Sequence, residues 1–113
     1  MSTAVASIAE NSGGGTYAYR CSKAALNMSM KSLSVDLAST GILVMSMHPG
    51  WVLTDMGGPN AQITTETCCS TMIQTLAGLT EKVFLGNNGN NLSITILQDH
   101  GTFLRYNNTG IQW

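Results

Sequence analysis

The run Ile42-Leu43-Val44-Met45-Ser46-Met47 constrains the fold of this chain more than any other segment. It is short, it is nearly continuous in apolar residues, and it directly follows a stretch with helical periodicity. A strand that is covered on both faces has this composition, because neither of its faces meets water. We therefore predict that residues 42–47 form a strand inside a parallel sheet whose faces are covered by helices.

A long amphipathic helix is predicted ahead of that strand, over residues 18–39. Apolar residues recur there at helical spacing, which gives the helix one face to bury. Gly41 closes the helix, and Gly13 to Gly15 mark a loop before it, because ordering three consecutive glycines has a large entropic cost. The predicted buried face comprises Ala24, Leu26, Met28, Met30, Leu33, Val35 and Leu37.

The second half of the chain continues the alternation of strands and helices. Thr64 or Thr65 can cap a helix that carries Glu66 in its first turn and runs to about Thr80. Residues 86–91 are rich in Gly and Asn and are expected to form a turn, and strands are predicted over 92–97 and 102–106. Strands and helices in alternation indicate an α/β domain.

Composition excludes several functional classes. Charged residues make up 10% of the chain against the usual roughly 25%, and the net charge is -1, so no basic face is available for nucleic acid or an anionic membrane. No apolar run approaches a membrane span, and the N-terminus lacks the basic and hydrophobic pattern of a signal peptide, so we expect a soluble, unsecreted chain. Three cysteines favour reduced thiols in the cytoplasm over a disulfide framework. The scattered histidines and cysteines lack the spacing of a metal site, so no metal is expected.

Tyr19 and Lys23 are the strongest candidates for chemistry. They lie four residues apart near the start of the predicted long helix, so their side chains project from one face, one turn apart. A tyrosine is a weak acid at neutral pH, and a fixed ammonium nearby stabilises its phenolate and makes it a better general acid. The pair alone is also compatible with a half-buried tyrosine beside a solvated lysine.

The sequence around the pair is more specific. Tyr17-Ala18-Tyr19-Arg20-Cys21-Ser22-Lys23-Ala24-Ala25-Leu26 resembles the active-site helix of the short-chain dehydrogenases/reductases. The resemblance implies the C-terminal portion of a Rossmann-like, doubly wound parallel sheet. It also implies that Tyr19 donates a proton to a substrate carbonyl, while Lys23 assists it and holds the nicotinamide ribose, so that both residues contact the cofactor.

A second block supports this resemblance. His48-Pro49-Gly50-Trp51-Val52-Leu53-Thr54-Asp55-Met56 follows the buried strand, at the sheet edge where open α/β folds bind ligands. In the family, Pro49 and Gly50 would skirt the nicotinamide, the main chain of Val52 would hold the carboxamide, and the Thr54 hydroxyl would meet the pyrophosphate. Taken alone, the block would be a strand-ending turn with His48 as a packed residue.

Two further stretches indicate a subgroup within the short-chain dehydrogenases/reductases. The stretch 12–19 and the ending 101–113 resemble the sniffer and C-factor type of carbonyl reductase. This implies a small-molecule ketone, aldehyde or quinone as substrate and favours NADP(H) over NAD(H). Residues 86–100 depart from the family pattern.

Three hydroxyl residues are alternative candidates for the hydrogen-bond donor that holds the substrate carbonyl. By register Thr3 takes the place of the family's serine, with Ser2 as its neighbour, while Ser7 matches a later serine of the same loop. Each of them can donate the required hydrogen bond.

The glycine-rich turn that seats the dinucleotide phosphates is absent. We therefore expect residues 1–113 to be the C-terminal part of the cofactor-binding domain. The alternative function is a catalytically silent fragment that acts only through association, with the long helix as the surface for a homo-oligomer. With its covering elements missing, the isolated chain is expected to be partly unfolded or self-associated.

Overall fold

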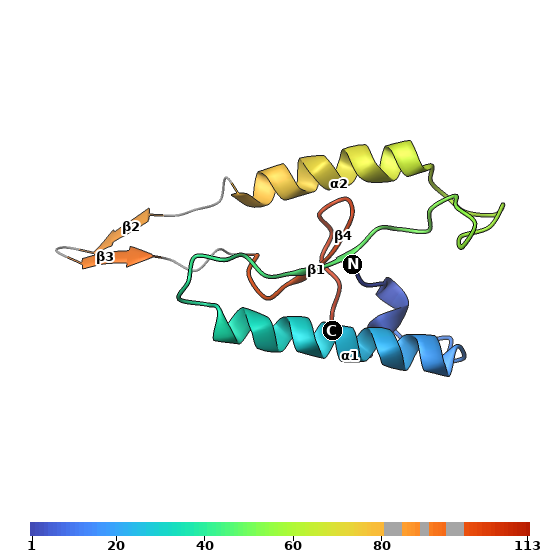
Figure 1. Cartoon of the computed structure of the whole chain (residues 1–113), viewed down its shortest axis with the longest axis horizontal. Coiled ribbons are helices and arrows are strands. Elements are labelled where there is room, and N and C mark those ends of the chain that lie inside the picture. Colours follow the sequence, from blue (N-terminus) through green and yellow to red (C-terminus); the bar gives the residue numbers. More distant parts are fainter. Residues whose placement is uncertain (81–84, 89–90, 95–98) are drawn as a thin grey trace.

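The computed structural model describes residues 1–80, 85–88, 91–94 and 99–113. Two long helices run along opposite sides of a short parallel strand pair, and a hairpin projects from one end (Figure 1). This arrangement confirms the predicted α/β class. In chain order the elements are η1 (Ala4–Ala6), α1 (Tyr17–Asp36), β1 (Ser46–His48), α2 (Thr65–Thr80), β2 (Leu85–Asn88), β3 (Asn91–Ile94) and β4 (Phe103–Arg105).

The parallel pair β1–β4 forms the centre of the molecule. Ser46 lies opposite Phe103 and His48 lies opposite Arg105. On the other edge of β1, the backbone N–H of Ser2 donates to the carbonyl of Met47 at 2.7 Å. The first residues of the chain therefore extend the sheet beside β1, so that three segments end together at one edge.

The strand predicted over 42–47 is shorter and begins later than expected. β1 starts at Ser46, and Ile42 is 53% exposed rather than buried. The prediction fails there because Val44 uses its backbone groups elsewhere: its N–H donates to His100 Nδ1 at 3.2 Å, and its carbonyl accepts from the N–H of Gly101 at 2.8 Å. A histidine ring thus takes the place of a neighbouring strand.

The long helix is present as α1, but its buried face differs from the predicted one. Asn27 and Ser34 are its buried residues, whereas Met28 and Val35 are each 67% exposed and Leu33 is also exposed. The expectation that these three apolar side chains enter the core is therefore wrong in this structure. The helix approaches the sheet through its small and polar side chains, and much of its apolar stripe faces solvent.

The second helix matches its prediction. Thr64 Oγ1 accepts from the N–H of Thr67 at 3.2 Å, which makes Thr64 the cap, and Glu66 lies in the first turn of α2. An acidic residue is favourable there because the N-terminus of a helix carries a partial positive charge.

The turn predicted over 86–91 is partly wrong. Gly86 to Asn88 lie in β2, which pairs antiparallel with β3 in the register Leu85 opposite Ile94 and Asn88 opposite Asn91. A Gly- and Asn-rich sequence can still pair through its backbone, although its strand propensity is low. The strand predicted over 92–97 coincides with β3 up to Ile94, and residues 95–97 lie outside the described residues.

The C-terminal segment closes the core. Phe103 is almost fully buried and stacks on Trp113 with ring centroids 5.3 Å apart. Ile111 donates its N–H to the carbonyl of Phe103 at 2.8 Å, so the tail folds back against β4. The strand predicted over 102–106 corresponds to β4.

Candidate active site

A cleft of about 840 Å3 opens at the carboxyl end of β1. Residues from the N-terminal segment, from α1 and from the loop after β1 line it, and its wall is mainly apolar. Lys23 and Ser7 are not among the lining residues. The candidate residues that do line it are Ser2, Thr3, Tyr19, Pro49, Gly50, Val52 and Thr54.

Tyr19 enters the cleft from the first turns of α1. Its side chain is 43% exposed, and Lys23 lies one helical turn further on, partly buried. Among the described residues, no hydrogen bond or ion pair engages the Tyr19 hydroxyl or the Lys23 ammonium. Both groups are therefore free to act on a ligand.

The loop after β1 passes close to other parts of the chain. Gly50 has φ +88, and a Cβ at this position would lie 2.7 Å from Ile63 Cδ1, so a side chain would be both strained and crowded. Val52 forms a parallel bridge with Ile63, and the N–H of Leu53 donates to the Ile63 carbonyl at 2.8 Å. These contacts hold the main chain of residues 50–53 along the cleft.

The same loop then closes on itself. Thr54 Oγ1 accepts from the N–H of Gly57 at 3.1 Å and donates to the Val52 carbonyl at 3.3 Å. The Trp51 indole N–H donates to the Gly57 carbonyl at 2.7 Å. A Cβ at Gly57 would lie 1.9 Å from the Val52 carbonyl oxygen, so only glycine fits this turn.

The three candidate carbonyl donors have different surroundings. Ser7 is fully buried; its hydroxyl donates to the Gln112 carbonyl at 2.5 Å and accepts from the N–H of Glu10 at 3.0 Å. Thr3 and Ser2 are buried beside the cleft. The Ser2 Oγ has no hydrogen-bond partner among the described residues. Ser7 is therefore committed to holding the loop together, whereas Ser2 and Thr3 are not.

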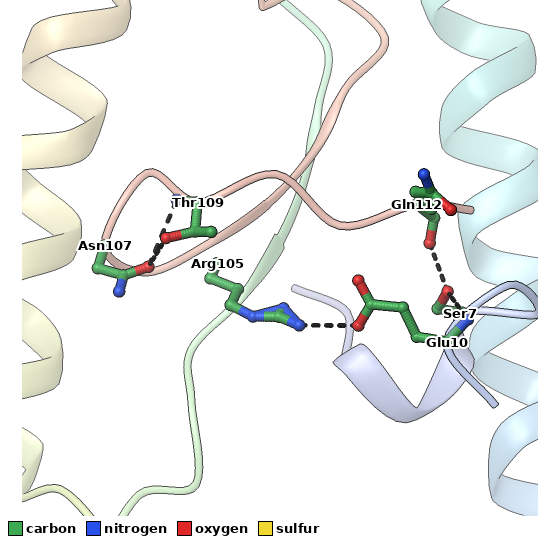
Figure 2. A network of polar contacts seen from close by, with 6 residues as sticks. All are labelled: Ser7, Glu10, Arg105, Asn107, Thr109 and Gln112. Atoms are coloured by element: carbon green, nitrogen blue, oxygen red, sulfur yellow. Dashed lines mark hydrogen bonds and ion pairs between the residues drawn. The ribbon is translucent and has the colours of Figure 1, made fainter. Parts of the chain in front are cut away.

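His48 also lines the cleft, although its sequence context suggested only a packed residue. Burial and the neighbouring Arg105 guanidinium lower the pKa of His48 below its ordinary value of 6.5, and Glu10 opposes this shift. Figure 2 shows the Arg105 side chain reaching from β4 to Glu10, where Nη2 and Oε2 are 2.7 Å apart. Because Arg105 lies far along the chain, no local sequence signal could have revealed this neighbour.

With a mainly apolar wall that also presents the Tyr19 hydroxyl and backbone groups of residues 50–54, the cleft fits one end of a nicotinamide cofactor. The Lys23 ammonium lies one helical turn from Tyr19, outside the residues that line the cleft. Within residues 1–80, 85–88, 91–94 and 99–113, no cluster of three His, Cys, Asp or Glu could hold a metal. None of the described helices is long and apolar enough to cross a membrane.

A family model described as short chain dehydrogenase matches residues 3–65. The C-signal protein of Myxococcus xanthus is 36% identical over 113 residues, which is all of this chain and 58% of that protein. This chain therefore spans little more than half of a relative that it matches throughout.

Solved structures give the same family. The carbonyl reductase Sniffer of D. melanogaster superposes with a TM-score of 0.79 and 40% identity, covering 100% of this chain and 39% of that one. The NADPH-bound carbonyl reductase from chicken fatty liver superposes with a TM-score of 0.74 and 30% identity, covering 99% of this chain and 40% of that one. The Rossmann-like fold of these reductases is thus shared by a partial domain here.

Proposed function

The chain belongs to the short-chain dehydrogenase family, and from that premise we propose that it supplies the carbonyl-reducing half of an NAD(P)(H)-dependent oxidoreductase. The substrate is a small ketone, aldehyde or quinone. The observation that carries this proposal is the single cleft into which Tyr19, the Ser2–Thr3 segment and the loop 49–54 all project.

Each group has a distinct part in the reaction. Tyr19 gives its hydroxyl proton to the carbonyl oxygen, because its phenol lines the cleft and its hydroxyl has no hydrogen-bond partner among the described residues. Lys23, one turn away, stabilises the phenolate left behind and holds the ribose. Thr3, or Ser2 beside it, donates a hydrogen bond that orients the carbonyl. Bound NADPH would supply the hydride.

The cofactor loop would hold the nicotinamide end. The main chain at Val52 is fixed by its bridge to Ile63, which would let its amide N–H meet a carboxamide, while its carbonyl accepts from the Thr54 hydroxyl. The Thr54 hydroxyl is exposed and takes part in a local turn, from which it could turn to a pyrophosphate oxygen. The phosphate-binding turn lies in the other half of the family domain, so we define the complete enzyme as this chain joined to that half.

We favour NADP(H) over NAD(H). The support is that the chicken carbonyl reductase binds NADPH, and that a related short-chain dehydrogenase/reductase from Burkholderia multivorans has bound NADP. The three cysteines are free thiols, in keeping with a cytoplasmic enzyme.

A tyrosine pair in α1 tests the proposed chemistry. In the complete enzyme, Tyr19→Phe should lower kcat about 100- to 10,000-fold, the range expected for a general acid, and should leave the NADPH Kd nearly unchanged. Tyr17→Phe, on a residue that is 79% exposed two positions earlier, is the matched control and should keep full turnover. Equal turnover in both variants would remove Tyr19 from the mechanism.

The rival function, a silent fragment that associates through its helices, is favoured by one observation. Met28 and Val35 on α1, and Ile73 on α2, are apolar side chains that face solvent. Such exposed apolar groups commonly mark interaction surfaces. Light scattering after size-exclusion chromatography should show the isolated chain as a homo-oligomer, and Met28→Lys with Val35→Lys should shift it toward the monomer. A monomeric wild type would exclude this rival.

A further inference from the structure

Arg20, the residue after Tyr19, joins α1 to two other segments of the chain. Its Nη1 donates to the Val5 carbonyl at 2.7 Å, and its Nε lies 3.2 Å from the carbonyl oxygens of both Gly14 and Gly15. A guanidinium can bind several acceptors at once because its N–H donors form a rigid planar fork. One side chain on α1 therefore holds residues 2–10 and the glycine loop together.

The bond to Val5 spans the two parts of the cleft that have to meet at one substrate oxygen. Val5 lies in η1, two residues after Thr3, whereas Tyr19 belongs to α1. Within the described part of the chain, no other hydrogen bond connects residues 2–10 with α1. The remaining bonds of residues 2–10 stay within that segment and the loop after it, or lead to β1, β4 and the C-terminal tail. The Arg20–Val5 bond therefore fixes the separation of Thr3 and Tyr19.

The bonds to Gly14 and Gly15 fix the entry into α1. Gly14, Gly15 and Thr16 follow one another with φ of 62°, 68° and 44°. Left-handed backbone suits glycine but is unfavourable for Thr16, whose side chain makes no capping hydrogen bond. Arg20 thus holds a strained turn that has no side-chain cap, and Tyr19 lies in the first helical turn after it.

Arg20 does not owe its place to the stability of the helix. The N-terminus of a helix carries a partial positive charge, so a cation in the first turns is unfavourable. The first turn of α1 contains no acidic residue, and the Arg20 guanidinium pairs with no carboxylate among the described residues. The three backbone carbonyls therefore explain this arginine better than charge pairing does.

We propose that Arg20 is a positioning residue, which sets the Tyr19 hydroxyl against the hydroxyl of Thr3 or its neighbour Ser2. The inference rests on the proposed function, in which both hydroxyls bind the same carbonyl oxygen. Two donors on separate segments reach one oxygen only if the segments keep a fixed separation, and a misplacement of about 1 Å can cost about 100-fold in rate. Arg20 does not line the cleft, so it acts through these residues.

Arg20→Met in the complete enzyme removes the fork and keeps much of the apolar stem. We expect kcat to fall about 10- to 100-fold, while the NADPH Kd stays within about twofold because the cofactor loop is untouched. Arg20→Lys keeps the charge but cannot bind all three carbonyls, so it should recover only part of kcat. Lys31→Met is the matched control: it removes another cation from α1, one that donates to the Gly101 carbonyl at 3.4 Å, and should keep kcat.

A coupling measurement separates positioning from a general loss of structure. In an enzyme that already carries Ser2→Ala and Thr3→Ala, adding Arg20→Met should lower kcat by less than about twofold, because no carbonyl donor is left to place. A merely structural arginine would lower kcat by the same factor in both backgrounds.

A measurement on the wild-type complete enzyme needs no variant to fold. Nitrogen NMR should show the Arg20 Nε–H as a resolved signal that exchanges slowly with water, since this N–H faces the Gly14 and Gly15 carbonyls. A freely exchanging Nε–H would contradict the proposal.

The inference would also be overturned by normal kcat in Arg20→Met, by full recovery in Arg20→Lys, or by equal losses in the two backgrounds. Failure of the proposed function looks different. In that case the wild-type enzyme would reduce no carbonyl, or Tyr19→Phe would be fully active. Failure of the Arg20 inference alone leaves the wild type active and dependent on Tyr19.

Discussion

The two walls of the cleft are held in place in opposite ways. The cofactor loop, residues 49–58, is fixed largely by its own neighbours: Thr54 and Trp51 both bind Gly57 within a few residues. The carbonyl segment, residues 2–10, is held mainly by distant parts of the chain, namely Met47 in β1 and the C-terminal tail. The loop is thus closed by local bonds, whereas the carbonyl segment depends on long-range contacts.

Figure 2 shows how the tail holds the carbonyl segment. Ser7 binds the Gln112 carbonyl and Glu10 pairs with Arg105. In addition, the N–H of Ala9 donates to the Trp113 carbonyl at 3.2 Å. Changes in the loop should therefore act on cofactor binding, and changes that remove contacts between the carbonyl segment and the tail should act on global stability.

Gly57→Ala should have the largest effect on the loop. The new Cβ would lie 1.9 Å from the Val52 carbonyl oxygen, so the turn has to open, at a cost of about 3 kcal/mol or more. We expect the NADPH Kd of the complete enzyme, measured by calorimetry, to rise on the order of 100-fold. Gly58→Ala, which meets no atom within 4 Å and suffers only from its φ of +72, should have a smaller effect. Equal effects would contradict the local closure of the loop.

Ser7→Ala tests the opposite wall. It removes two hydrogen bonds of a buried hydroxyl, so the free energy of unfolding in urea should fall by about 2 kcal/mol, while kcat of the folded enzyme changes little. Thr3→Ala should do the reverse, with a clear loss of kcat and a small loss of stability. If Ser7→Ala lost turnover without losing stability, Ser7 would be the carbonyl donor after all.

Thr54→Val removes the hydroxyl that closes the cofactor loop but keeps the shape of the side chain. The loss of the two exposed turn hydrogen bonds of this hydroxyl should weaken NADPH binding by about 1 kcal/mol, or roughly fivefold. Thr54→Ser keeps the hydroxyl and should bind NADPH like the wild type. A valine variant with unchanged affinity would show that the loop does not depend on these two bonds.

The smallest expected effect is a dependence of stability on pH. Because the pKa of His48 is lower in the folded state than its ordinary 6.5, the unfolded chain binds a proton first as the pH falls. Stability should thus be complete above pH 6.5 and decline below it, until the folded form also becomes protonated. Urea unfolding of the complete enzyme at pH 7.5 and 5.5 measures this change, and His48→Gln should make it smaller. A wild type that gains stability on acidification would contradict the sign.

Local sequence patterns predicted the parts of the site that are built locally. The spacing of Tyr19 and Lys23 fixes their common helix face, and the Pro49-Gly50 turn after an apolar strand places the loop at the sheet edge. The resemblance to the family assigned them roles. The surroundings of His48 were beyond such patterns, because they depend on Arg105 in another strand and on Glu10 in another loop.

The errors in the fold have a similar physical origin. Helical periodicity identifies a stripe on α1 but does not say which neighbour will cover it, and so Met28 and Val35 were assigned to a core that they do not enter. Likewise, no local rule announces that the His100 ring will satisfy the backbone of Val44 in place of a strand.

The packing of the C-terminal tail affects where other sequences can be attached to this chain. The Trp113 carbonyl accepts from Ala9, and the Trp113 ring stacks on Phe103, so the carboxyl end of the chain is packed against the wall that holds the carbonyl segment. Residues appended after Trp113, such as an affinity tag or a fused reporter, would have to leave from this packed position and would strain the carbonyl segment.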